Sequence, residues 1–437
     1  MKSSKNLFQL CFLFVLVLNY SSNAQSLVSV VEVLSSIKEN NYDLKTAQQN
    51  IRTAEILSSK LSQGYKPTLS ATAGVGYNLN GIKQVFNFNF PDIDIQNIQA
   101  INGNIGISSS YLLYDAGQRK LRNEQNLTSL DAAHLQEDNI YQSLSFTATQ
   151  LYYNIVQAVF TIHLLEESFA ISKYRYDRVN TLYQYGSQNK VDVLNAEVDV
   201  ARDSLNLTSV ENDIKNLKWQ LNQLTLREDT NYQVDTSFEL VYKNAQLSDL
   251  QSTMLQSNKE LKVLEKNIDL VQYDLELADK TNTPQVFANG GYSVSFQNNS
   301  TKSQIDINRS NGLNLGLSAN WTILDDGQRK LQNQLAIVDQ QNTLIALDTR
   351  KNELNTQINS LWNSYQNNLL NIRIEEQNIA TNRVNFELVK TLYESGQQGS
   401  VEFRQAQLNL INAQAQYYAA RTTAKLLEVE LDFLLGK

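Results

Sequence analysis

The residues that could do chemistry in this sequence are few, and their spacing supports none of the common reactions. Asp325 and Asp326 are neighbouring carboxylates, a pairing that can hold a metal ion or move a proton, but no base or metal ligand accompanies them. The two histidines, His134 and His163, lack metal-ligand spacing. The sequence has no Walker loop, no Gly-x-Ser-x-Gly and no His-Glu-x-x-His. It therefore predicts no enzyme, no metal site and no cofactor.

The carboxylate at 325 belongs to a motif that occurs twice. LLYDAGQRKL at 112–121 recurs as TILDDGQRKL at 322–331, each time after an apolar stretch and before a long polar one. An Asp at this point can accept hydrogen bonds from the free N–H groups of a helix's first turn, and Gly permits a backbone bend. The motif predicts a joint at which a strand passes into a helix. Its residues are Asp115, Gly117, Arg119, Asp325, Gly327 and Arg329.

A second motif repeats at the same spacing of 210 residues. LYQYG at 182–186 recurs as LYESG at 392–396, and a Val-Asp or Val-Glu pair follows each one. A glycine after a helical stretch allows the chain to reverse. This motif therefore predicts the tip of a helical hairpin.

Further matches indicate that the chain is internally duplicated. NYDLK at 41–45 resembles NKELK at 258–262, and Pro67 matches Pro284. Fixed spacing between several matching blocks is the mark of a repeat. We expect the first repeat at 25–227 and the second at 228–437, with a connection at 230–260 in which residues 232–238 add a short strand.

Four segments alternate between apolar and small polar residues, as half-buried strands do, with Leu112 the one lapse. Each is near the length that a tilted strand needs to cross a bilayer. An ordinary antiparallel sheet of a soluble domain is the alternative, but a second face of Ser, Thr, Asn and Gly without charge is unusual for a solvent surface. The predicted strands are about 68–80, 104–114, 285–297 and 312–324.

Four strands cannot close a barrel by themselves. Sheet edges are not tolerated in lipid, and the smallest closed barrels use about eight strands. The chain must therefore oligomerise for a membrane sheet to form. Two copies would give eight strands and three would give twelve, and strand counting does not choose between them.

The stretches between the motifs predict very long helices. No Pro or Gly occurs between Gly117 and Gly186, which is enough for a helix of roughly 100 Å at 1.5 Å per residue. Apolar residues there recur every three or four positions, which is typical of a coiled-coil seam. The predicted helices are about 117–186, 191–224, 328–395 and 401–435.

The N-terminus predicts export. Two lysines precede an apolar run at 7–18, and Ser22-Asn23-Ala24 follows, which is the layout of a signal peptide over residues 1–24. The single cysteine, Cys11, lies inside that run, so the mature chain would have no disulfide. No later segment has about 18 consecutive apolar residues, which argues against a transmembrane helix. The net charge of −8 and the lack of a basic cluster argue against nucleic acid as a partner.

Taken together, the export signal, the duplication, the two strand pairs and both repeated motifs resemble the TolC-type outer-membrane efflux protein family, also called outer membrane factors. The resemblance covers essentially the whole mature chain. It implies a mixed α+β membrane protein that forms a homotrimer. Each protomer would contribute four transmembrane strands to a twelve-stranded β-barrel in the lipid of the outer membrane, and long coiled-coil helices to a periplasmic α-barrel.

The resemblance also implies a function. The protein would be the passive exit duct of a tripartite efflux pump or a type I secretion system, opened at its periplasmic tips by an adaptor linked to an inner-membrane transporter of the RND or ABC type. The alternative is a secreted periplasmic coiled-coil adaptor without a pore. The tip residues that match the family pattern are Leu182, Tyr183, Gly186, Val191, Leu392, Tyr393, Gly396 and Val401.

By the same resemblance, carboxylates at the start of the last helix can narrow the entrance. Glu402 matches the first position, whereas the second position holds Gln405, and Asp192 is the counterpart of Glu402 in the first repeat. One carboxylate per chain would leave a ring of three in a trimer. A carboxylate that only meets the helix dipole is the alternative role for both acidic residues.

Overall fold

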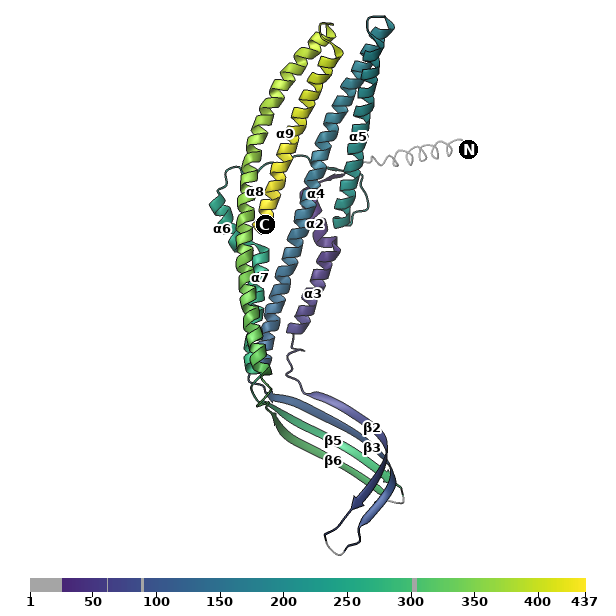
Figure 1. Cartoon of the computed structure of the whole chain (residues 1–437), viewed down its shortest axis with the longest axis vertical. Helices are drawn as coiled ribbons and strands as arrows, with labels where there is room; N and C mark the ends of the chain where they lie inside the picture. Colours follow the sequence, from purple (N-terminus) through teal and green to yellow (C-terminus); the bar gives the residue numbers. More distant parts are fainter. Residues whose placement is uncertain (1–25, 61, 88–89, 301–304) are drawn as a thin grey trace, which may run out of the picture. The chain divides into compact units, whose positions relative to one another are not determined.

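The computed structural model describes residues 26–60, 62–87, 90–300 and 305–437, so the predicted signal peptide lies outside the described residues. Figure 1 shows the elements in chain order. The helices are α2 (Val30–Asn40), α3 (Tyr42–Ser58), α4 (Gln118–Gln184), α5 (Lys190–Thr225), α6 (Leu247–Ser257), α7 (Lys259–Lys280), α8 (Gln328–Glu394) and α9 (Ser400–Leu434). The strands are β1 (Ser26–Val28), β2 (Thr68–Gln84), β3 (Ile93–Tyr114), β4 (Tyr232–Val234), β5 (Gln285–Asn299) and β6 (Ile307–Asn320).

The chain forms two compact units that cut across the predicted repeats. Unit 1 combines Met1–Ala47, Glu137–Leu261 and Arg350–Lys437. Unit 2 combines Gln48–Gln136 and Lys262–Thr349. Each unit therefore takes segments from both halves of the sequence, and the long helices α4 and α8 run from one unit into the other.

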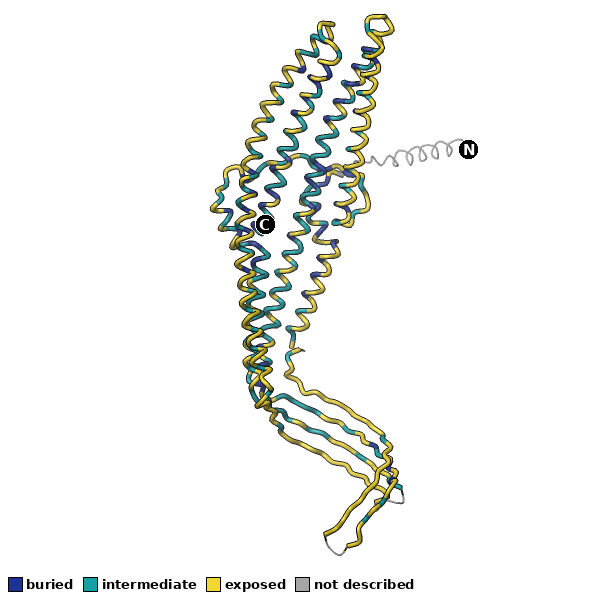
Figure 2. The backbone as a smooth tube through the Cα atoms, in the orientation of Figure 1, coloured by how far each residue is buried: buried dark blue, intermediate teal, exposed yellow. Residues whose placement is uncertain are grey.

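Unit 2 contains one antiparallel sheet of four strands in the order β2-β3-β5-β6. In one row of the register, Thr68 lies opposite Ser110, Ser110 opposite Asn289, and Asn289 opposite Gly316. Since β2 and β6 each have one neighbour within the chain, both present an open edge. Figure 2 shows the strands largely exposed.

Four of the predicted strand boundaries are wrong by four residues or more. β2 continues to Gln84 instead of about 80, and β6 begins at Ile307 instead of about 312. The strand expected at 104 begins at Ile93. The β2–β3 register shifts near Asn80, and Asn97 adopts a φ of 60°. The alternation of apolar and polar residues is therefore interrupted before residue 104, which hides the true start of the strand. A bulge of this kind adds unpaired residues and breaks period two. The last strand ends at Asn320 instead of about 324, since the Trp321 indole N–H donates to the Asn282 carbonyl (3.1 Å) where the chain turns toward α8.

The four long helices begin and end within three residues of the predicted positions, and α4 and α8 both have 67 residues. The shorter helices α2, α3, α6 and α7 were not foreseen, and the predicted connection at 230–260 holds β4 and α6. The matching asparagines, Asn41 and Asn258, explain where two of these shorter helices, α3 and α7, begin. Asn41 and Asn258 each accept a hydrogen bond from the first turn of the following helix, with Leu44 N (3.3 Å) and Leu261 N (3.1 Å) donating. Both motifs are therefore helix caps.

The core of unit 1 lies where β1, β4, α2, α4, α5 and α9 meet. Tyr152 of α4 is buried there, and its hydroxyl lies within hydrogen-bond distance of two acceptors, the Val28 carbonyl (3.0 Å) and the Asp235 carbonyl (2.9 Å). Burial raises the pKa of Tyr152 to about 12. The same helix holds the one stretch among the described residues that is long and apolar enough to cross a membrane, which revises the exclusion above. A core helix has the same composition, and α4 supplies core residues such as Ile155.

Candidate functional sites: strand-to-helix joints and hairpin tips

The first joint is a tight turn closed by its aspartate. Ala116 and Gly117 have φ angles of 54° and 83°, and the Gln118 N–H donates to the Asp115 carbonyl (3.1 Å). Two consecutive residues with positive φ characterise a type I′ turn. The Asp115 carboxylate accepts from Arg119 N (2.9 Å) and Arg119 Nε (2.9 Å). Asp115 therefore caps α4 and fixes the arginine that follows.

The second joint repeats this geometry. Asp326 and Gly327 have φ angles of 54° and 80°, and Asp325 accepts from Arg329 N (3.0 Å) and Arg329 Nε (2.6 Å). The hydrogen bond from Arg329 holds the pKa of Asp325 below its usual range. Of the two neighbouring carboxylates, Asp325 therefore caps α8, and Asp326 occupies a turn position.

Each joint arginine also binds the chain that enters the sheet. Arg119 Nη1 donates to the Gly64 carbonyl (3.2 Å), and its guanidinium lies 4.7 Å from the centre of the Tyr65 ring. Arg329 donates through Nη1 to the Asn282 side chain and through Nη2 to the Ile323 carbonyl (3.0 Å). The joints thus fasten the start of a strand pair to the helix that leaves it, and their role is mechanical.

Both hairpin tips end their first helix in the same way. Ser187 N donates to the Leu182 carbonyl (2.8 Å) and Gly186 N to the Tyr183 carbonyl (2.9 Å), with Gly186 at φ 73°. This pair of bonds defines a Schellman motif. The second tip has the same two bonds, from Gln397 N to the Leu392 carbonyl (2.8 Å) and from Gly396 N to the Tyr393 carbonyl (3.1 Å).

The two tips differ in the surface that they expose. Tyr183 is 39% exposed and Val191 is 62% exposed at the first tip. Tyr393 of the second tip is only 5% exposed, because its ring stacks on Phe403 (4.6 Å) beneath the Arg178 guanidinium. Tyr393 is therefore a packing residue in this structure, which corrects its assignment to the adaptor-contacting surface.

The predicted entrance carboxylates lie in the first turns of α5 and α9. Asp192 N donates to the Asn189 side chain (2.9 Å), so α5 has a side-chain cap. Gly399 at the start of α9 has no side chain, and the Glu402 carboxylate folds back beside it: a Cβ on Gly399 would lie 2.5 Å from Oε2. Glu402 and Gln405 are both exposed.

Sequence reasoning missed a buried polar cluster that joins the two hairpins. Arg404 of α9 makes a double hydrogen bond with Asp203 of α5, and Ser168 and Ser172 of α4 also donate to that carboxylate at 3.0 and 2.6 Å. Burial alone would raise the pKa of Asp203, but the hydrogen bonds from Arg404 and Ser172 and the positive charge of Arg404 outweigh it, so this pKa is lowered. In the sequence, the available signal for this cluster was Arg404, an arginine among the apolar residues of a helix seam.

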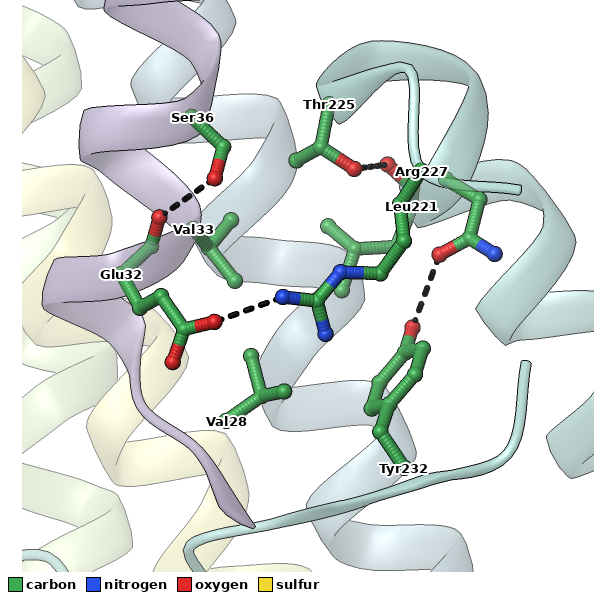
Figure 3. Close-up of a pocket in the computed structure, with 9 residues that line it drawn as sticks. Val28, Glu32, Val33, Ser36, Leu221, Thr225, Arg227 and Tyr232 are labelled. Carbon is green, nitrogen blue, oxygen red and sulfur yellow. Dashed lines mark hydrogen bonds and ion pairs between the residues drawn. The ribbon is translucent and has the colours of Figure 1, made fainter. Parts of the chain in front are cut away.

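Figure 3 shows a small cavity of about 10 Å³ between α2, α5 and β4, where Arg227 binds Glu32 (2.6 Å) and the Tyr232 hydroxyl donates to Asn222 (3.1 Å). That volume suits about one water molecule. Among the described residues, no group of three or more His, Cys, Asp or Glu side chains could hold a metal ion.

Comparison with solved structures gives the same fold over nearly the whole chain. CusC, described as forming a transmembrane channel, is 16% identical, with a TM-score of 0.76 and coverage of 96% of this chain and 95% of that one. The CmeC outer membrane channel of Campylobacter jejuni is 15% identical, with a TM-score of 0.75 and coverage of 93% and 85%. The open-state MtrE outer membrane channel of Neisseria gonorrhoeae is 17% identical, with a TM-score of 0.72 and coverage of 93% and 88%.

A search among curated proteins finds no match. The family model for outer membrane efflux proteins matches residues 33–225 and 250–437. These two matched segments hold both hairpins and both joints, and together they make up most of the chain. The chain belongs to the outer membrane efflux protein family.

Proposed function

We propose that three copies of this chain form the exit duct of a tripartite efflux pump or a type I secretion system, with the sheet in the outer membrane and the hairpins in the periplasm. Family membership and the fold support this reading. One observation carries this proposal. The sheet of unit 2 and the helical hairpins of unit 1 each have two flanks that a single chain leaves uncovered.

The first pair of flanks belongs to the sheet. One face carries apolar side chains that are exposed in the single chain, such as Leu69 (75%), Val75 (81%) and Leu315 (78%). From Leu69 to Tyr77 this face spans nine residues of β2, close to the ~9–11 that a tilted strand needs in a bilayer. Lipid can cover the face, but the β2 and β6 edges require strands of neighbouring copies.

The second pair of flanks belongs to the hairpins. In unit 1 the helices are drawn in the order α8, α9, α4, α5, and Phe160 of α4 stacks on Tyr418 of α9 at 4.4 Å. On the outer helix α5, residues Val191, Val198 and Leu205 are 62%, 56% and 72% exposed and recur every seven positions. A heptad spacing of apolar residues marks a seam that packs against another helix.

The opposite outer helix has a matching seam. Leu370 and Val384 of α8 are 52% and 71% exposed, and Ile374 and Leu388 are 47% and 60% exposed. Each pair is separated by fourteen residues, or two heptads. Packing α8 of one copy on α5 of the next gives a head-to-tail contact, which closes into a ring. Such a ring of hairpins and strands encloses water, and its opening is at the tips.

The experiment uses the absence of cysteine from the predicted mature chain. Val198→Cys and Val384→Cys lie at similar distances from the tips, on outer helices of opposite flanks. In the double variant we expect disulfide-linked species up to three chains on a non-reducing gel. Val31→Cys with Val384→Cys is the control, because Val31 is 76% exposed on α2, away from both seams. A largest species of two chains would support the eight-stranded alternative, and an uncrosslinked chain would contradict the ring.

A further inference from the structure

We propose that the polar face of the sheet is an uncharged wall past which solutes of either charge move alike, so that the barrel between Thr68 and Gly76 contributes no charge selection. This inference rests on the proposed function, which turns the polar face toward the water of the duct. It concerns a property of the wall that the existence of a duct does not require.

The strand register places uncharged polar residues side by side across all four strands. One row reads Ser70, Ser108, Gly291, Asn314, and the row two residues further along β2 reads Thr72, Gly106, Ser293, Gly312. The three other rows are also polar and uncharged. The row before these two reads Thr68, Ser110, Asn289, Gly316. The two rows after them read Gly74, Asn104, Ser295, Ser310 and Gly76, Asn102, Gln297, Asn308.

The charged residues of the strands lie elsewhere. Arg309 pairs with Phe296, which pairs in turn with Gly103, and this row begins with Val75 on the apolar face. Lys83 and Asp94 are register partners of each other beyond the β2–β3 bulge. A formal charge is therefore missing from every row of the polar face between Thr68 and Gly76.

Glycines opposite asparagines let the uncharged amide groups lie along this wall. A Cβ on Gly74 would lie 2.8 Å from Asn104 Oδ1, and a Cβ on Gly291 would lie 2.9 Å from Asn314 Oδ1. The amide groups therefore occupy the space that a side chain would take, and lie across the sheet on the neighbouring strand. Real Cβ atoms essentially never approach a heavy atom so closely, so only glycine permits this arrangement.

The polar groups of the wall are also bonded to one another. Ser110 donates to Asn289 Oδ1 (2.9 Å), Asn289 donates to Ser318 (2.8 Å), and Ser295 and Ser310 share a hydrogen bond of 2.8 Å. The first rows of this face line a hollow of about 390 Å³, and every residue around that hollow is uncharged. A surface without charge, whose hydrogen bonds are partly satisfied within the sheet, gives no preference to solutes of one sign of charge.

The test measures the electrostatic potential at the wall with charged thiol reagents. Ser108→Cys would be the single cysteine of the mature chain, and reagents added outside the cell reach it without passing the tips. We expect cationic and anionic methanethiosulfonates to react at rates whose ratio, after correction for a free thiol in solution, is within about threefold of one. Adding Thr72→Asp in the adjacent row should favour the cationic reagent by about tenfold.

The outcomes separate this inference from the proposed function. A strong charge preference in the Ser108→Cys protein itself would overturn the uncharged wall while leaving the duct intact. Protection of Ser108→Cys from both reagents, together with labelling of Val75→Cys on the opposite face, would overturn the proposed function instead. Equal rates that do not respond to Thr72→Asp would also overturn the inference, because the reagents would then not report the wall.

Discussion

Arg404 and Asp203, which are 201 residues apart in the sequence, form a buried pair with two hydrogen bonds of 2.8 and 2.9 Å between guanidinium and carboxylate. Their side chains are 9% and 5% exposed. The pair connects α9 to α5, so the second hairpin is fastened to the first about one turn beyond the start of α9 at Ser400. Paired hydrogen bonds between arginine and carboxylate fix geometry as well as adding energy.

Breaking this pair from one side should destabilise unit 1. We expect Arg404→Met to lower the free energy of unfolding by about 3–5 kcal/mol, because the Asp203 carboxylate would remain buried without its cation. The double variant with Asp203→Leu should recover most of the loss. Thermal unfolding followed by circular dichroism measures both effects. Arg52→Met is the matched control, since the Arg52–Glu55 pair has side chains that are 71% and 44% exposed.

The pair should be insensitive to pH over the physiological range. The pKa of Asp203 is lowered in the folded protein, so its stabilisation is complete above the ordinary carboxyl pKa of about 3.9 and is lost only as the pH falls through the lower folded value. The stability difference between wild type and Asp203→Asn should therefore stay constant from about pH 8 to pH 5 and shrink below about pH 4. A difference that changes between pH 8 and 6 would contradict this assignment.

The joints offer a stabilising change. Ala116 has a left-handed backbone with a φ of 54°, a conformation that costs about 1 kcal/mol or more for a residue with a Cβ. Ala116→Gly should therefore raise the unfolding midpoint, whereas Gly117→Ala, at φ 83°, should lower it. Asp326→Gly at the second joint is the control. Its gain should be smaller, because Asp tolerates this conformation better than Ala. Equal responses at 116 and 326 would argue against backbone strain as the cause.

Glu402 distinguishes a selective entrance from a plain helix cap. If its carboxylate faces the entrance, Glu402→Gln should lower cation selectivity in single-channel recordings, and unchanged selectivity would leave only the capping role. Gly399→Asn provides the opposite change, because an added side chain would displace the carboxylate that lies beside it. The new Asn would cap α9 as Asn189 caps α5, and the freed Glu402 should increase cation selectivity.

Two glycines of the polar face should respond differently to the same substitution. Gly291→Ala would bring a Cβ within 2.9 Å of the Asn314 amide and 3.1 Å of the Ile107 carbonyl, and should lower the temperature at which the folded form is lost on a heat-modifiability gel. Gly316→Ala meets open space and should be neutral or stabilising by up to about 1 kcal/mol, because it restricts the unfolded chain. Equal losses at both positions would show that the facing amide is not the cause.

The sequence predicted the elements that rest on local patterns. The joint and tip motifs marked Asp115, Gly117, Gly186 and their repeats because a turn with positive φ or a Schellman end needs these residue types within a few positions. The long helices followed from uninterrupted polar sequence with seam spacing. The copy number did not follow from any local pattern, since the proposed ring depends on surfaces that other copies would cover.

The features that were missed depend on residues far apart in the chain. The bulge near Asn97 disguised the start of β3. Arg404 directly precedes Gln405 in the sequence, but its partner Asp203 lies on another hairpin, 201 residues away. The repeated asparagines were recognised as a match but not as caps, and their second role was invisible: Asn41 Nδ2 donates to the Leu224 carbonyl and Asn258 Nδ2 to the Leu434 carbonyl, both at 3.0 Å.

Unit 1 is assembled from three separate stretches of the chain, and this has a consequence for its biogenesis. The first strand, Ser26–Val28, finds its partner only at Tyr232–Val234, and Leu431 and Leu434 of the final helix are buried. Contacts between such distant segments form late, because a long loop must close before they are made. A nascent polypeptide emerging from the export machinery would thus carry unsatisfied apolar surface until nearly its last residue has crossed, and would depend on holdase chaperones throughout that interval.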